Sequence, residues 1–397
     1  MMVFRILIPI FILIFSFNVL TARIFYVSVI KRRPLLIRYI YQLLNLGSFA
    51  AVGLLVYSMA KGSDLFSPDR YMVYVVYYYL LFFLPQFIYI LFLGISKLVK
   101  DNAGVIRGIG SITATFLFGT MIWGHYVTAR TFDVREYTVS SPKIPDSFND
   151  YRIVQFSDLH IGNFDGETAL IQTLIDSING LNPDLILFTG DLVTYHSKEV
   201  LPFRKQLSTL RAKDGVYAVL GNHDYSEYHR WKNEEEKEID FRQFKRMVGQ
   251  LGWKLLNNDA VRLTKDSSSI VLAGMENWGE PPFPTHGDLE KAIAQVNPSA
   301  NEFILLMSHN PEFWRHHIRN QRKDIDLTLS GHTHAMQLKV NFAGKSYSPA
   351  AMRYPLWGGM HKDSLNNRIL INEGIGNVFY PMRVGATPEI SVITLTR

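Results

Sequence analysis

The sequence contains no cysteine among its 397 residues. This absence excludes disulfide bonds, thiolate catalysis and cysteine-ligated zinc, so any metal site must use oxygen and nitrogen donors. Acids are scarce in residues 1–130, which hold only Asp64, Asp69 and Asp101 against 12 lysines and arginines. The rest of the chain carries 29 of the 41 basic residues and 32 of the 35 acidic ones. Because the net charge of +6 comes entirely from the N-terminal part, a nucleic-acid partner is disfavoured.

Four long apolar runs occupy this basic N-terminal part, at residues 6–29, 40–59, 71–95 and 109–127. Each is close to the ~20 residues that an α-helix needs to cross a bilayer. We therefore predict an all-α transmembrane domain of about four helices over residues 1–130. Four buried helices of a soluble protein are the alternative, which the scarcity of acids disfavours. The first run also resembles a signal peptide, but no small-x-small cleavage site follows it, so we expect a retained helix.

Positive charge in the short loops predicts the orientation of these helices. Basic residues gather at 31–33 in the first loop and at 97–107 in the third. Because such loops stay in the cytoplasm, four spans place both chain ends outside it. We expect an integral protein of the inner or plasma membrane whose C-terminal domain, residues 151–397, is extracytoplasmic. Residues 131–150 contain two prolines and predict an extended linker.

Side chains that can bind metal follow five apolar segments, which we predict as strands alternating with amphipathic helices. They are Asp158 and His160 after "YRIVQFS", Asp191 after "DLILFTG", Asn222 and His223 after "VYAVLG", His309 after "FILLMS", and His332 and His334 after "DLTLSG". In open α/β sheets, ligands bind beyond the carboxyl ends of the strands. Residues two apart share one side of an extended chain, so Asp158 and His160 can reach one point if the chain stays extended.

Each of these residues has an ordinary explanation when taken alone, since Asp and Asn are common in turns and helix caps. Their repetition after five strands predicts a metal site instead. In the stretch "GNHD", Gly221 permits a tight exit from the strand. Asn222 offers an amide oxygen to a cation, and His223 is left for chemistry rather than coordination.

The motifs resemble those of the calcineurin-like metallophosphoesterases. They are "DLH" at 158–160, "GD" at 190–191, "GNHD" at 221–224, "SHNP" at 308–311 and "GHTH" at 331–334. The resemblance covers about residues 150–397 and is greatest to the membrane-anchored bacterial branch. That branch often continues "GHTH" with Gly-Gly-Gln, whereas Ala335, Met336 and Gln337 follow here.

The resemblance implies an α/β catalytic domain, a four-layer αββα sandwich, at residues 151–397. It also implies two divalent metal ions, whose identity among Mn, Fe and Zn the mixed donors do not decide. The implied ligands are Asp158, His160, Asp191 and His334 for one ion, and Asp191, Asn222, His309 and His332 for the other. His223 is then the general acid toward the leaving group, and Asp224 orients it. Arg383 is either a phosphate contact or a surface arginine paired with a carboxylate.

These features predict a membrane-anchored, metal-dependent phosphoesterase that hydrolyses a phosphodiester or pyrophosphate through a metal-activated hydroxide. The anchor favours a phospholipid or a nucleotide-linked lipid as substrate. A catalytically retired membrane scaffold that keeps the fold is the alternative, which the intact ligand set opposes. A transporter or receptor regulated by the C-terminal domain is a third reading. The sequence leaves the oligomeric state open.

Overall fold

The computed structural model describes residues 15–61, 68–164, 166–281 and 283–397. The chain divides into two compact units. Unit 1 comprises Met1–Tyr126 with Phe379–Met382, and unit 2 comprises Val127–Val378 with Arg383–Arg397.

Unit 1 contains three long apolar helices among its described residues. They are α2 (Leu35–Lys61), α3 (Pro68–Leu98) and α4 (Ala103–Tyr126). The segments Leu35–Leu54, Val73–Leu98 and Lys100–Arg130 are long and apolar enough to cross a membrane. They correspond to the second, third and fourth predicted spans. A shorter apolar helix at Phe15–Ile30 overlaps the first predicted span, and residues 6–14 of that span lie outside the described residues.

Apolar side chains point outward from these helices, as expected for surfaces that face lipid. Leu43, Ile112 and Phe116, for example, are 67%, 72% and 72% exposed. Where α3 and α4 meet, a Cβ at Gly110 would collide with Phe92. The missing side chain lets the two backbones approach closely, which is typical of helix contacts in membranes.

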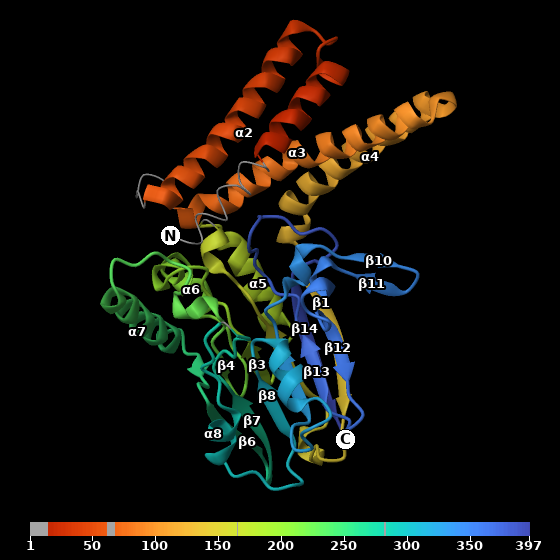
Figure 1. The fold of residues 1–397 in the computed structure, drawn as a ribbon. Coiled ribbons are helices and arrows are strands. Elements are labelled where there is room, and N and C mark those ends of the chain that lie inside the picture. The colour runs from red at the N-terminus through yellow and green to blue at the C-terminus, as the bar shows by residue number, and fades with distance from the viewer. Residues whose placement is uncertain (1–14, 62–67, 165, 282) are drawn as a thin grey trace. The chain divides into compact units, whose positions relative to one another are not determined.

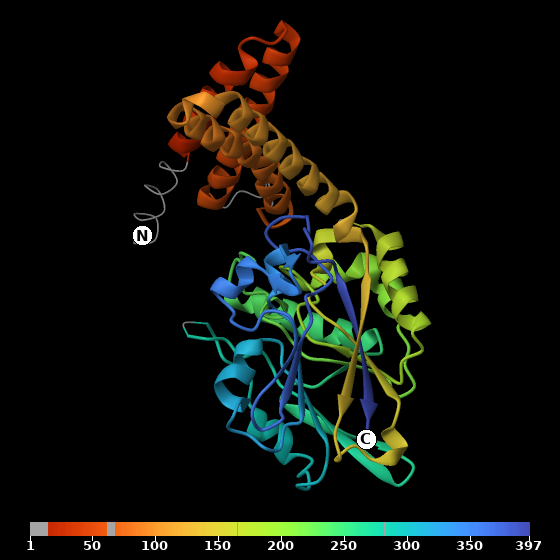
Figure 2. The ribbon, with the colours of Figure 1, turned by 90° about the vertical axis from the view of Figure 1, so that its right-hand side faces the viewer.

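Unit 2 is built on two six-stranded mixed sheets (Figure 1). The first contains, in spatial order, β1 (Asp133–Ser140), β14 (Glu389–Thr396), β2 (Tyr151–Phe156), β3 (Leu185–Phe188), β4 (Val216–Ala218) and β5 (Lys254–Leu255). The second contains β12 (Gly359–Lys362), β13 (Arg368–Ile371), β9 (Leu327–Ser330), β8 (Ile304–Met307), β7 (Ser268–Gly274) and β6 (Asp259–Lys265). A separate hairpin joins β10 (Val340–Phe342) and β11 (Lys345–Tyr347). Figure 2 shows β1 beside β14, with which it pairs in parallel.

Helices cover the outer face of each sheet. They are α5 (Thr168–Gly180), α6 (Arg204–Leu207), α7 (Glu234–Gln250), α8 (Leu289–Ala294) and α9 (Pro311–Phe313). Ile175 of α5 and Phe244 of α7 share a core with Val154 of β2. On the other side of the molecule, Ile293 of α8 shares a core with Val271 of β7.

A third core lies between the two sheets and includes Ile153 of β2, Leu187 of β3 and Leu305 of β8. Neighbouring residues of a strand point to opposite faces, so Ile153 meets the second sheet while Val154 meets the helices. Strands covered on both faces read as nearly continuous apolar runs, which is the pattern of the predicted strands. The three cores confirm the predicted four-layer αββα sandwich.

Parallel pairing brings the predicted site residues to one edge of each sheet. β2 pairs in parallel with β3, β3 with β4, β7 with β8, and β8 with β9. Strands that run the same way end at the same edge, so the loops that follow them meet there.

The core between the sheets should dominate the stability of unit 2. Leu187→Ala removes a fully buried side chain from it, and we expect the free energy of unfolding to fall by about 2–5 kcal/mol. Leu201→Ala, at a leucine that is 53% exposed, is the matched control and should change it by less than about 0.5 kcal/mol. Tryptophan fluorescence of the detergent-solubilised full chain during denaturation measures both. Equal losses in the two variants would contradict the assignment of this core.

Candidate metal centre

Two groups of donor atoms meet at the edge where the strands end, and Asp191 lies between them. In the first group, His334 Nε2 lies 3.1 Å from His160 Nε2 and 3.2 Å from Asp158 Oδ1. Asp191 Oδ2 lies 3.5 Å from His160 Nε2 on this side, and 3.3 Å from His309 Nε2 on the other. Asp191 is therefore placed to serve both groups.

The second group surrounds His309. Its Nε2 lies 3.2 Å from Asn222 Oδ1 and 3.1 Å from His332 Nδ1. Ligand atoms of Asp191, His309 and His332 all lie within 4.8 Å of one another, as do those of Asp158, His160 and His334. The structure thus brings together all seven residues predicted as metal ligands, and places His332 and His334 in different groups.

The backbone reaches this arrangement by left-handed turns, which corrects the expectation of an extended chain. Asp158 and His160 have φ values of 54° and 43°, and Asp191 has 60°. His332 and His334 have 74° and 51°. Side chains other than glycine enter this region at a cost, and such strain gathers at functional sites. The turns, rather than strand alternation, make the paired ligands converge.

Two glycines let the loops approach one another. A Cβ at Gly221 would overlap the Asp191 carboxylate, and a Cβ at Gly331 would overlap Ser157 and the Asp158 carboxylate. Gly221 was predicted to permit a tight exit from its strand. Glycine is needed at this position because any side chain would collide with Asp191.

Burial and neighbouring charges shift the pKa values of these groups, in the direction that favours metal binding at Asp158 and His332 and in the opposite direction at His309. Burial opposes the charge of Asp158, but the imidazole of His334 holds the pKa of Asp158 well below its usual range. Burial and the neighbouring His309 lower the pKa of His332 to about 3. Burial also lowers the pKa of His309, but Asp191 and Asp158 outweigh it and raise that pKa to about 9. Ionised carboxylates beside neutral imidazoles suit a divalent cation, which would displace the proton from His309.

Neighbouring groups fix the ring orientation of two of these histidines. His309 Nδ1 lies 2.8 Å from the Thr189 carbonyl oxygen, to which its N–H donates. His332 Nε2 lies 3.0 Å from the Tyr354 hydroxyl, which can accept its N–H. In each ring the opposite nitrogen is left to face the donor group. Partners of this kind set the tautomer of a metal-binding histidine.

The position of Arg383 contradicts both of its predicted roles, as a phosphate contact and as a surface arginine paired with a carboxylate. It is fully buried and donates to the carbonyl oxygens of Glu373, Gly376 and Ala386. Its Nη2 also lies 3.0 Å from His334 Nδ1. A buried guanidinium so surrounded neither lies at the surface nor faces a phosphate, and it instead packs behind a predicted ligand.

His223 and Asp224 lie beside the two groups but do not contact each other through their side chains. A nitrogen of His223 lies within 4.8 Å of ligand atoms of His160 and Asp191. Its Nδ1 lies 2.8 Å from the Thr194 carbonyl oxygen, which takes the place that was predicted for Asp224.

The buried Asp224 carboxylate accepts four backbone N–H groups, at distances of 2.8–3.2 Å. They belong to Asp191, Leu192, Val193 and Gly221. The expectation that Asp224 orients His223 is therefore wrong, because three of these contacts hold the Asp191 loop and the fourth holds Gly221 of its own loop.

Sequence reasoning missed two tyrosines at this site. Tyr354 contacts His332, and nothing in its sequence context signals that role. The Tyr228 ring stacks on His223 with centroids 4.2 Å apart, and its hydroxyl accepts from Asn222 Nδ2 at 2.9 Å. Tyr228 lies in the segment before α7 begins.

Among the described residues, Glu280, Glu312 and His316 form one further group of metal-capable side chains. Arg353 pairs with Glu280 at 2.5 Å, and Arg315 pairs with Glu312 at 2.5 Å. The two guanidinium groups already neutralise both carboxylates, so this cluster is an ion-pair network rather than a metal site.

Comparison with known proteins identifies the family. Residues 151–336 match the family of calcineurin-like phosphoesterases. The uncharacterized metallophosphoesterase YkuE of Bacillus subtilis is 30% identical over 294 residues, which cover 72% of this chain and 92% of YkuE. This chain belongs to the calcineurin-like phosphoesterases. It is accordingly a metal-dependent phosphoric ester hydrolase, and its two donor groups are candidate sites for divalent ions.

Two other relatives are similar over most of this phosphoesterase. A transmembrane protein with metallophosphoesterase domain from Danio rerio is 27% identical over 334 residues, 81% of this chain and 71% of that protein. The UDP-2,3-diacylglucosamine pyrophosphatase LpxG of Chlamydia trachomatis is 26% identical over 336 residues, 74% of this chain and 97% of LpxG. Of solved structures, a dimetal phosphatase from Danio rerio has a TM-score of 0.35 at 12% identity, over 57% of this chain and 88% of that one. This chain has apolar helices that are long enough to cross a membrane, and it is similar to a transmembrane protein. Both findings support its association with a membrane.

The residues that follow "GHTH" form a left-handed turn although none of them is glycine. Ala335 and Met336 have φ values of 50° and 44°, a region that residues with a side chain enter at a cost of about 1–2 kcal/mol. The turn is held by Met336 N–H donating to Thr333 O at 2.8 Å, and by the Ser348 hydroxyl donating to Ala335 O at 2.6 Å. This phosphoesterase thus keeps a glycine-type turn without glycine.

The contact between Tyr354 and His332 yields a test of the second donor group. Tyr354→Phe removes only the hydroxyl that accepts from His332, so we expect metal affinity of this group to fall by about 10–100-fold. Titration of the metal-free full chain with Mn²⁺, followed by calorimetry, measures it. Tyr347→Phe, at a tyrosine that is 54% exposed, is the control. Equal affinities in the two variants would show that the hydroxyl does not orient His332.

Proposed function

We propose that this phosphoesterase uses two divalent cations to hydrolyse a phosphodiester or pyrophosphate bond of a phospholipid or a nucleotide-linked lipid. The observation that carries the proposal is the position of Asp191 between the two donor groups. A carboxylate with one oxygen 3.5 Å from His160 and 3.3 Å from His309 is placed to bridge neighbouring cations.

The donors of this chain fit such a pair of ions. We assign Asp158, His160 and His334 to one ion, Asn222, His309 and His332 to the other, and Asp191 to both. When bound, paired cations lower the pKa of a shared water and bind phosphoryl oxygens. His160 Nε2 and His334 Nε2 face each other at 3.1 Å. His334 Nε2 also lies 3.2 Å from Asp158 Oδ1, so three donor atoms converge on one place that a cation could occupy.

His223 is suited to protonate the leaving group. Its Nδ1–H donates to the Thr194 carbonyl oxygen, so Nε2 is the nitrogen that can exchange a proton with the substrate. Stacking on Tyr228 and an edge contact with His160, with centroids 4.7 Å apart, hold the ring in one plane. Burial lowers the pKa of His223, and an imidazole held in this way can deliver a proton to the departing oxygen once it is protonated.

A lipid substrate is supported by the membrane helices and by one relative. LpxG carries the name of a pyrophosphatase that acts on UDP-2,3-diacylglucosamine, a nucleotide-linked lipid, and the match spans 97% of its length. Helices that keep the catalytic unit beside a bilayer raise the local concentration of any substrate that resides in that bilayer.

We further propose that residues 1–130 anchor the protein, that 131–150 join the two parts, and that 151–397 form the catalytic domain on the extracytoplasmic side. Basic residues at 31–33 and 97–107 flank α2 and α3, which supports cytoplasmic loops at both places. Helix α4 then leads out of the cytoplasm. This orientation depends on α2–α4 alone and not on the first apolar run.

A substrate panel tests the proposed function. We expect the Mn²⁺-loaded full chain to hydrolyse a lipid pyrophosphate and an aryl phosphodiester, and chelation by EDTA to abolish both activities. Asp191→Ala should lose them as well, because it removes the shared ligand of both groups. Phosphate or nucleotide release is the measurement. Absence of turnover of every substrate by metal-loaded protein would instead support a retired membrane scaffold.

The role of His223 has its own signature. His223→Ala should bind as much Mn²⁺ as the unaltered chain, because this side chain is assigned to neither ion, while kcat falls by about 10²–10⁴-fold for an alkyl leaving group. The loss should be smaller for nitrophenyl esters, whose leaving group needs no proton. Elemental analysis and steady-state kinetics measure the two effects. A variant that loses metal, or that loses equal activity on both leaving groups, would contradict the role of general acid.

A further inference from the structure

In the segment that follows His334, a row of apolar side chains is exposed while the polar Gln337 and Lys339 between them are buried; Asn341, further along, is exposed. Leu338, Val340 and Phe342 are 37%, 56% and 72% exposed, whereas Gln337 and Lys339 are 3% and 8% exposed. A strand on the surface of a soluble domain normally shows the opposite alternation. Single exposed apolar residues are common, but a row of them on one face indicates an interaction surface.

Hairpin pairing extends the row onto a second strand. Val340 lies opposite Tyr347 and Phe342 lies opposite Lys345, while Asn341 lies opposite Ser346. Residues directly opposite in an antiparallel pair share a face. We call the face with Leu338, Val340, Phe342, Lys345 and Tyr347 the outer face of the hairpin, and the face with Lys339, Asn341 and Ser346 its inner face. Figure 1 shows β10 and β11 projecting beyond the strands of both sheets.

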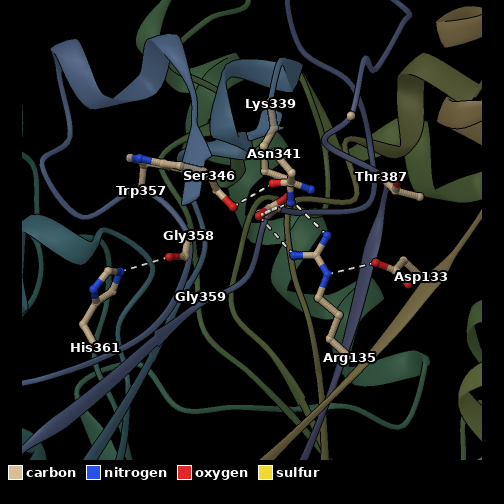
Figure 3. A pocket seen from close by; sticks show the side chains of 12 residues that line it. Asp133, Arg135, Lys339, Asn341, Ser346, Trp357, Gly358, Gly359, His361 and Thr387 are labelled. Atoms are coloured by element: carbon tan, nitrogen blue, oxygen red, sulfur yellow. Dashed lines mark hydrogen bonds and ion pairs between the residues drawn. The ribbon is translucent and has the colours of Figure 1, made fainter. Parts of the chain in front are cut away.

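The inner face covers a polar pocket of about 570 Å³ (Figure 3). Lys339 Nζ reaches both Glu373 oxygens at 2.6 Å, and Arg135 reaches Glu373 and Glu389 at 3.0 and 2.7 Å. The Ser346 hydroxyl donates to Asn341 Oδ1 at 2.7 Å. These contacts hold Lys339 inside the domain, whereas Asn341 and Ser346 bond to each other and stay exposed.

The buried ion pair also prevents the apolar side from turning inward. A slip of one residue would exchange the two faces, and it would remove Lys339 from Glu373 and leave a buried carboxylate with one partner fewer. The backbone is tied as well, since the Lys339 N–H donates to Val384 O at 2.8 Å. The outer face is therefore held toward the surroundings by interactions on the opposite face.

We propose that the outer face of this hairpin lies in the membrane interface, at the boundary between lipid headgroups and acyl chains. Its composition suits that place, because aromatic rings and lysine anchor proteins at this depth while apolar side chains enter the acyl region. This proposal rests on the proposed function and deepens it, since a hairpin that starts six residues after His334 would bring a lipid-linked substrate to the metal centre.

The short connection between α4 and β1 favours the bilayer as the partner of the outer face. Asp133, the first residue of β1, lines the pocket under the hairpin. It follows Tyr126, the last residue of α4, by seven residues. Whatever the orientation of the two units, a chain of this length holds Asp133 within ~25 Å of Tyr126. The end of unit 2 that carries the hairpin is thus tethered to a membrane-spanning helix.

Site-specific fluorescence tests the proposal, and the absence of cysteine makes each introduced thiol unique. Val340→Cys and Phe342→Cys place a label on the outer face, and Asn341→Cys and Ser346→Cys place it on the inner face of the same hairpin. Each full-length variant carries a nitrobenzoxadiazole label and is inserted into nanodiscs of phosphatidylethanolamine and phosphatidylglycerol. Replacing part of the lipid by doxyl lipid then reports contact with acyl chains.

We expect labels at 340 and 342 to be blue-shifted and quenched severalfold more than labels at 341 and 346. Equal quenching at all four positions would overturn the proposal. A blue shift at 340 and 342 without quenching would overturn it too, because a protein surface would then cover the face. The measurement needs no turnover, so its failure is distinct from failure of the substrate panel, which tests the proposed function with the unaltered chain.

Discussion

The position of one buried carboxylate, that of Asp191, determines the rest of the centre. Its oxygen faces His160 on one side and His309 on the other, and the Asp158 carboxylate, which accepts the N–H of His332, joins the two groups a second time. Asp224 holds the loop by accepting the N–H of Asp191 and of its neighbours, and Gly221 leaves room for the carboxylate. Asp224 does not touch substrate in our proposal, but by holding this loop it sets the position of Asp191, on which the proposed chemistry depends.

This geometry is maintained against opposing forces. Five of the proposed ligands have positive φ, and several buried imidazoles and carboxylates crowd together at 3.1–3.5 Å. The four-layer fold offsets these costs through its three apolar cores, and the carbonyl oxygens of Thr189 and Thr194 hold the rings of His309 and His223. Such a site is expected to depend on its cations for part of its stability, because ions that bind only the folded chain shift the unfolding equilibrium.

The two faces of the β10–β11 hairpin connect the centre to the membrane in our proposal. On the inner face, Lys339 pairs with Glu373, which also pairs with Arg135, and the outer face is left apolar. Glu373 also adjoins Gly374, at which a Cβ would press against Asp158 and His334. Residues 373–374 therefore link the hairpin to the metal centre. Glu373 lines the pocket and pairs with Lys339, and Gly374 packs against Asp158 and His334.

Sequence patterns alone determined the apolar helices, the α/β class and the positions of the metal-capable residues, because apolar periodicity and residue type are local properties of the chain. They did not determine how these residues converge, since left-handed turns at Asp158 and His160 depend on packing against loops distant in sequence. The same holds for the true contacts of Asp224 and Arg383 and for the roles of Tyr228 and Tyr354. Each of those side chains acquires its partner only when separate strands meet at one edge, and hydrogen bonds between distant segments leave no periodic trace in the sequence.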